Sequence, residues 1–253
     1  MSLTDAQLTK LIQLADAPEV VAIALTGSCA RGDATPYSDI DLLRFVAEMP
    51  EVGTYRLRAV DGRLVSLTTT TIERKRADLS APQEAIWAVM GLRRMRILRD
   101  SGGALAALQR EAFAFQWSPL QAQADRFASS ELMGNAEEAH KLMTGLHQGN
   151  EAVATYAAML LTMFLPGIVA VQRGLLLDSE NAYFSAVGEA VGHDSAWTRA
   201  HRAAAGFDQT DNHRRALAAL ELYRETAALI EPSICPEHRE VIEQAVVTSR
   251  AFI

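Results

Sequence analysis

Two aspartates, Asp39 and Asp41, are separated by one residue in the sequence SDIDLL. On a β-strand the side chains of residues i and i+2 leave the same face, about 6.5 Å apart along the strand. Ile40 and Leu42 then point to the opposite face, into a core. Two carboxylates held in this way repel each other unless a cation lies between them. The pair therefore predicts a site for Mg²⁺ or Mn²⁺, with water and phosphate oxygens as the other ligands.

A Gly-Ser turn precedes this pair. Gly27 follows an apolar run and permits a tight turn with close approach of a ligand to the backbone. Ser28 is placed to cap a short helix, and its hydroxyl and the N–H groups of the turn predict a phosphate cradle. Arg31 adds a positive charge that can fork onto phosphate oxygens. Together the turn and the carboxylates indicate one site, in which metal bridges a triphosphate to the two aspartates.

The elements around these residues are predicted from periodicity. Apolar residues recur at spacings of three and four over residues 3–15, which predicts an amphipathic helix. Residues 54–72 predict two strands joined by a hairpin turn at Asp61-Gly62. Further short strands are predicted within residues 19–27, 40–46 and 95–98. Helices on either side of a Ser-Ala-Pro break precede the last strand, so the first part of the chain is expected to be an α+β domain with a small mixed sheet.

The remainder of the chain is predicted to be helical. From residue 104 onward the sequence is rich in Ala, Leu and Glu with helical periods, which indicates five or six antiparallel helices packed as a bundle. We place the domain boundary between residues 1–112 and 113–253. The most apolar segment, residues 156–171, is shorter than the ~20 residues that cross a bilayer. We expect it to be a buried helix, kinked or broken near Pro166.

Composition limits the partners of the chain. Its 253 residues are 49% hydrophobic, which supplies ample core, and the formal net charge is −7, so no nucleic-acid partner is expected. The N-terminus has helical periodicity in place of a signal peptide, and no membrane segment is predicted. Cys29 and Cys235 lack metal or redox spacing, which favours reduced thiols and a cytoplasmic location. Apolar positions in the helical half are compatible with a homodimer.

The segment GSCARGDATPYSDIDLL resembles the signature of the nucleotidyltransferase superfamily that includes DNA polymerase beta. In that signature Gly and then Gly or Ser are followed by a spacer and by Asp, an apolar residue, and Asp or Glu. The spacer here is residues 29–38, within the usual range of the family. The Ala-Arg-Gly and Pro-Tyr-Ser-Asp details are most similar to bacterial aminoglycoside nucleotidyltransferases and to the minimal nucleotidyltransferases of toxin-antitoxin systems. The resemblance covers residues 25–43.

The resemblance implies a nucleotidyltransferase domain followed by an all-α helical bundle that serves as a substrate or accessory domain. It implies transfer of a nucleoside monophosphate from a nucleoside triphosphate to a hydroxyl of a small molecule, such as an aminoglycoside, or of a protein. Asp39 and Asp41 would be the catalytic and metal-binding residues, and two metal ions would lie about 3.5–4 Å apart. The nucleotide-binding residues would be Gly27, Ser28, Arg31 and Ser38.

One position departs from the family pattern. The family has a third carboxylate between apolar residues on a later strand, and here Ser66 occupies that place. Asp61 and Glu73 are expected in the hairpin turn and at a helix start. Glu73, Glu84 or a carboxylate of the helical half remain candidates to complete the site. Two functions therefore stay open: nucleotidyl transfer, or a catalytically degenerate protein that binds a nucleotide or a partner protein.

Overall fold

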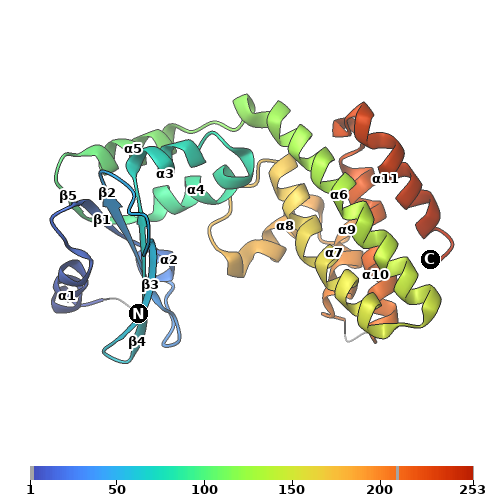
Figure 1. Cartoon of the computed structure of the whole chain (residues 1–253), viewed down its shortest axis with the longest axis horizontal. Coiled ribbons are helices and arrows are strands. Elements are labelled where there is room, and N and C mark those ends of the chain that lie inside the picture. The colour runs from blue at the N-terminus through green and yellow to red at the C-terminus, as the bar shows by residue number, and fades with distance from the viewer. Residues whose placement is uncertain (1–2, 209–210, 253) are drawn as a thin grey trace. The chain divides into compact units, whose positions relative to one another are not determined.

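The computed structural model describes residues 3–208 and 211–252, and its contacts divide the chain into two compact units. The units are Met1–Gln116 and Trp117–Ile253. The boundary predicted after residue 112 falls inside helix α5 (Ala104–Ala114), slightly before this division. Each unit has its own core, and Figure 1 shows the sheet in the first and the long helices in the second.

The first unit contains a five-stranded mixed sheet with the strand order β3-β4-β2-β1-β5. Strands β2 and β4 are parallel, and the other neighbouring pairs are antiparallel. The strands are β1 (Val20–Thr26), β2 (Ile40–Val46), β3 (Tyr55–Val60), β4 (Arg63–Thr70) and β5 (Arg96–Asp100). The helices are α1 (Asp5–Ala15), α2 (Gly27–Arg31), α3 (Ile72–Asp78), α4 (Pro82–Arg94) and α5. The predicted α+β domain with a small mixed sheet is confirmed.

Local sequence signals account for the ends of several of these elements. Thr4 begins α1 with a capping box, in which its side chain and that of Gln7 each accept a backbone N–H of the other residue. The predicted hairpin turn joins β3 to β4, with Asp61 at φ 51° and Gly62 at φ 75°. Thr71 caps α3 by accepting the N–H of Arg74.

Helices cover both faces of the sheet. Leu8 and Leu11 of α1 pack against β-strand residues such as Leu42 on one face. On the other face, Leu92 of α4 and Leu105 of α5 belong to a second core cluster with sheet residues. Because both faces are packed, the strands near the middle of the sheet are rigid supports for any side chains at their ends.

The second unit is mostly helical, as predicted. Its described residues form six α-helices and three short 3₁₀ helices. Helix α6 packs against α7 and α11, and α10 packs against α7 and α9. Trp197 and Tyr223 are fully buried in this core. The α-helices are α6 (Gln121–Gln148), α7 (Glu151–Gln172), α8 (Tyr183–Val191), α9 (Ala196–Ala205), α10 (Asn212–Leu229) and α11 (Pro236–Ser249), and the 3₁₀ helices are Ser118–Leu120, Glu180–Ala182 and Glu231–Ser233.

A helix kinked or broken near Pro166 is predicted from the sequence, and of these two alternatives the break is wrong. Helix α7 runs without interruption from Glu151 to Gln172 with Pro166 inside it. Proline has no N–H, so the carbonyl of Thr162 loses its usual helical donor. The buried His201 ring of α9 hydrogen-bonds to the Thr162 backbone, and this interhelical contact compensates for the missing donor.

Among the described residues, α7 is also the one helix long and apolar enough, by length and composition, to cross a membrane. Half of its most apolar window is buried inside the protein. The core helix of a folded unit has the same properties, so the expected absence of a membrane partner stays a prediction.

Burial of His201 predicts a pH dependence of stability. Desolvation lowers the pKa of His201 from 6.5 to about 4. The unfolded chain therefore binds the proton more readily, and stability falls as the pH drops from 6.5 towards 4. We expect His201 alone to lower the free energy of unfolding by about 2 kcal/mol between pH 7 and pH 5.

Urea unfolding at the two pH values, followed by circular dichroism, measures this effect. His201→Gln keeps a side-chain N–H donor but does not titrate, so it should reduce the difference between the two pH values. The same change at the exposed His213 should not. An unchanged pH dependence in His201→Gln would contradict the assignment.

Candidate active site

The site is built where β1 ends beside β2. Strand β1 ends at Thr26, and the chain turns at Gly27, with φ 63°, directly into α2. Thr26 is paired with Asp41 across the two strands. A Cβ atom at position 27 would lie only 2.1 Å from Asp41 Oδ2. The backbone of the turn is therefore in contact with the Asp41 carboxylate, and position 27 accepts only glycine, which has no Cβ atom.

The two predicted carboxylates occupy different environments. Asp41 lies within β2 and is half-buried, whereas Asp39 is exposed and stands one residue before the strand begins. Burial raises the pKa of Asp41, and the negative charge of Asp39 raises it further. The Ser66 hydrogen bond and the positive charge of Arg31 lower the pKa but do not cancel the rise. A cation between the aspartates would relieve this unfavourable charge.

Ser66 is joined directly to this pair. It is opposite Asp41 in the parallel register of β2 and β4, so both side chains leave the same face of the sheet. The Ser66 hydroxyl donates a 2.7 Å hydrogen bond to Asp41 Oδ1. The structure thus places a neutral hydroxyl where the family pattern has a carboxylate.

The acids considered as replacements have other roles. Asp61 lies in the hairpin turn and forms a 2.6 Å ion pair with Lys10. Glu73 and Glu84 stand in the first turns of α3 and α4, where a negative charge is favourable. Within residues 3–208 and 211–252, no group of three or more His, Cys, Asp and Glu residues could hold a metal ion.

The predicted nucleotide-binding residues lie in and after α2. The helix begins after Thr26, so the prediction that Ser28 caps it is wrong: glycine opens the helix and Ser28 is in its first turn. Arg31 donates a 3.2 Å hydrogen bond to Asp33 and is close enough to lower the pKa of Asp41. The Ser38 hydroxyl accepts the N–H of Thr35 in the loop before Asp39. Their roles towards a nucleotide stay predictions.

Arg63, at the start of β4, was missed by the sequence analysis. Its guanidinium donates to the carbonyl of Ser38 at 2.9 Å and to Cys29 Sγ at 3.4 Å. It therefore ties α2 to the residue before Asp39. An arginine after a hairpin turn is usually exposed to solvent. No local sequence pattern links Arg63 to Ser38 and Cys29, which are 25 and 34 positions earlier in the chain.

Removing this tie should weaken nucleotide binding without unfolding the unit. We expect Arg63→Ala to reduce affinity for a metal-nucleotide complex about tenfold, a typical loss when a supporting partner is removed. Titration calorimetry measures the affinity, and thermal unfolding monitors the fold. Arg58→Ala, on exposed β3 of the same hairpin, is the matched control and should bind as the wild type does. Equal effects of both changes would show that general loss of positive charge, and not positioning, is responsible.

The donor set suits one divalent cation that arrives with a phosphate ligand. Two aspartates supply oxygen ligands, and Mg²⁺ commonly binds one or two carboxylates together with water and substrate phosphates. The Asp41 carboxylate lies directly against the Gly27 backbone, so a cation bound to it would be beside the N–H groups of the turn, which can hold phosphate oxygens. The residues present therefore fit a metal-triphosphate complex better than a metal ion alone.

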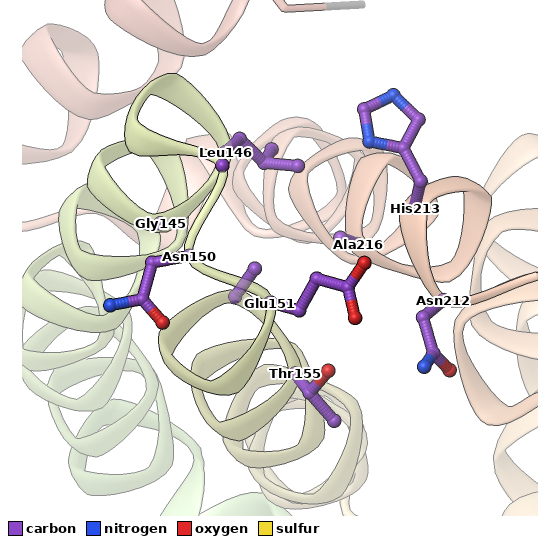
Figure 2. A pocket seen from close by; sticks show the side chains of 10 residues that line it. Gly145, Leu146, Asn150, Glu151, Thr155, Asn212, His213 and Ala216 are labelled. Carbon is purple, nitrogen blue, oxygen red and sulfur yellow. The ribbon is translucent and has the colours of Figure 1, made fainter.

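The helical unit contains a separate small hollow between the α6–α7 turn and the start of α10, of about 170 Å³. Figure 2 shows Glu151, Thr155 and His213 around it. Small-molecule sites usually enclose about 300–1,000 Å³. The hollow is smaller than a typical small-molecule site, and a larger one of about 690 Å³ lies in the same unit beside Phe184, His201 and Phe207.

Comparison with known proteins assigns the class of the first unit. Residues 8–83 match the family model described as a nucleotidyltransferase domain. The crystal structure of a nucleotidyltransferase-like protein from Exiguobacterium sibiricum 255-15 is similar with a TM-score of 0.54 and 18% sequence identity, over 90% of this chain and 76% of that chain. At this identity the likeness shows the fold alone. A comparison with curated proteins gives no match.

The chain therefore contains an N-terminal nucleotidyltransferase domain, followed by a mostly helical region. This confirms the superfamily that the sequence resembles, and it supports nucleotidyl transfer as the general class of reaction.

Proposed function

We propose that the first unit binds a nucleoside triphosphate with Mg²⁺ or Mn²⁺ and transfers its nucleoside monophosphate to a hydroxyl group. The observation that carries this proposal is the contact between the turn and the carboxylate. A Cβ at Gly27 would collide with Asp41 Oδ2, so phosphates held at the turn are next to a metal held by Asp39 and Asp41. The family match over residues 8–83 supports the same class of reaction.

In this reaction the acceptor oxygen attacks the α-phosphorus, and the bond from that phosphorus to the β-phosphate oxygen breaks. Pyrophosphate leaves, and the hydroxyl proton is released. A cation held there would neutralise charge on the triphosphate and on the leaving group. Asp39 and Asp41 would hold the cation, the backbone N–H groups of Gly27 and Ser28 would hold phosphate oxygens, and Arg31 would turn from Asp33 to a phosphate oxygen.

The acceptor is proposed to be an aminoglycoside-like small molecule or a protein side chain. The net charge of −7 favours a polycationic acceptor by electrostatic attraction. The helical unit is the proposed substrate or accessory domain. A cytoplasmic location, a homodimer and the absence of nucleic-acid or membrane partners belong to the same proposal.

A second candidate function is nucleotide binding without transfer. Ser66 favours it, because a neutral hydroxyl bonded to Asp41 takes the place of the third carboxylate. Such a protein would act as a nucleotide sensor or an interaction module.

Two measurements separate these functions. Calorimetric titration with ATP, GTP, CTP and UTP, with and without Mg²⁺ or Mn²⁺, tests binding. Pyrophosphate release with a panel of aminoglycosides and hydroxyl-bearing proteins tests transfer. Release that requires both the metal and an acceptor supports the transferase. Metal-dependent binding without release on any acceptor supports the second function, and no nucleotide binding contradicts both.

A further inference from the structure

We infer that this site binds one divalent cation, brought by the triphosphate, because serine at position 66 leaves the β4 side without the carboxylate that a second cation would need. The inference rests on the nucleotide binding proposed above and deepens it. It concerns the number of ions that the side chains of this chain can hold.

The first support is the geometry at Ser66. Its side chain is buried, and its hydroxyl donates to Asp41 Oδ1 at 2.7 Å. The strand register fixes both residues on neighbouring parallel strands, so the hydrogen bond is part of the sheet and not a loop contact. One oxygen of Asp41 thus already has a proton donor on the side where β4 lies.

The second support is the chemistry of the neighbouring positions. On the same face of the sheet, Ser66 is flanked along β4 by Leu64 and Thr68 and is opposite Leu57 of β3. None of these side chains carries a negative charge. Two divalent ions about 3.5–4 Å apart repel strongly unless carboxylates bridge and surround them. The β4 side of the site supplies no carboxylate for a second ion.

The third support is the charge on the other side of the site. Asp41 Oδ2 lies against the Gly27 backbone, and Asp39, two residues before Asp41, adds a second negative charge close to it. Two carboxylates and a triphosphate complete the coordination of one hard cation. The cation is therefore expected to bind tightly only together with the nucleotide.

The test counts bound Mn²⁺. The full chain is dialysed to equilibrium against Mn²⁺ and a non-hydrolysable analogue of the nucleoside triphosphate that binds best. The concentrations of Mn²⁺ and of the analogue are then measured on each side of the dialysis membrane. We expect one Mn²⁺ and one nucleotide per wild-type chain. Ser66→Asp restores a carboxylate and should raise the count to two Mn²⁺ per nucleotide. Ser66→Ala removes the hydroxyl without adding charge and should stay at one.

The outcomes are distinguishable. Two Mn²⁺ per wild-type chain, or one in a folded Ser66→Asp variant, overturns the inference but leaves the proposed nucleotide binding intact. No nucleotide on the protein side contradicts the proposed function itself and the inference with it. The wild-type count decides how many cations the site holds even if Ser66→Asp does not fold.

Discussion

Asp41→Asn is expected to lower affinity for a magnesium-nucleotide complex by about a hundredfold, because it removes a charged metal ligand. Asparagine has nearly the same volume, and its amide oxygen can still accept the hydrogen bond from Ser66. Binding of the nucleotide without metal should change little. Calorimetric titration with and without Mg²⁺ measures the affinity for the magnesium-nucleotide complex and the affinity for the nucleotide alone.

The same substitution should stabilise the folded unit at neutral pH. Burial and the charge of Asp39 raise the pKa of Asp41, so the charged form is disfavoured in the folded state. That cost is absent at pH values below the unfolded pKa and fully present above the raised folded pKa, and so at pH 7. Chemical unfolding should therefore give a higher free energy of unfolding for Asp41→Asn at pH 7, and a smaller difference at low pH.

Glu48→Gln is a suitable control for this prediction, since Glu48 is an exposed acid two residues after the end of β2. It should leave metal-dependent binding largely unchanged. Equal losses in both variants would show that binding responds to any loss of negative charge, and would count against Asp41 as a ligand.

Much of the first unit follows from short-range signals in the sequence. The capping residues of α1 and the Asp61-Gly62 turn lie within a few residues of what they determine. Strand positions follow from runs of β-branched residues. These signals act locally, and for that reason the predicted sheet elements agree with the structure.

Other features depend on residues far apart in the chain. The hydrogen bond at the Thr162 backbone, one helical turn before Pro166, comes from His201 of α9. The support that Arg63 gives to Ser38 depends on the return of β4 beside β2. Neither could be predicted from periodicity, because each contact is created only when the tertiary fold brings the two segments together.

The candidate site was half predictable. The spacing of Asp39 and Asp41 indicates metal chemistry, and the Gly27 turn indicates phosphate binding. Neither pattern predicts how the turn and the two carboxylates are placed relative to each other. The strand register supplies that information by pairing Thr26 with Asp41. The capping role assigned to Ser28 failed because a glycine with positive φ can open a helix directly after a strand.

Gly27→Ala is the most direct test of the contact between the turn and the Asp41 carboxylate. An alanine there would carry a left-handed φ of 63° and a Cβ atom 2.1 Å from Asp41 Oδ2. Left-handed backbone costs about 1–2 kcal/mol for a residue other than glycine. The collision additionally moves either the turn or the carboxylate, so metal-dependent nucleotide binding should fall by about a hundredfold or more.

Gly32→Ala is the matched control because Gly32, at the other end of α2, also has a left-handed φ, 89°, but has open space at its Cβ position. Gly32→Ala should lose about 1–2 kcal/mol of stability in urea unfolding and Gly27→Ala at least as much, whereas only Gly27→Ala should lose nucleotide binding. If Gly32→Ala lost binding to the same extent, backbone strain in α2 would explain the effect. If neither variant lost binding, the nucleotide would not be held at this turn, and the contact between Gly27 and Asp41 would serve only the packing of β1 against β2.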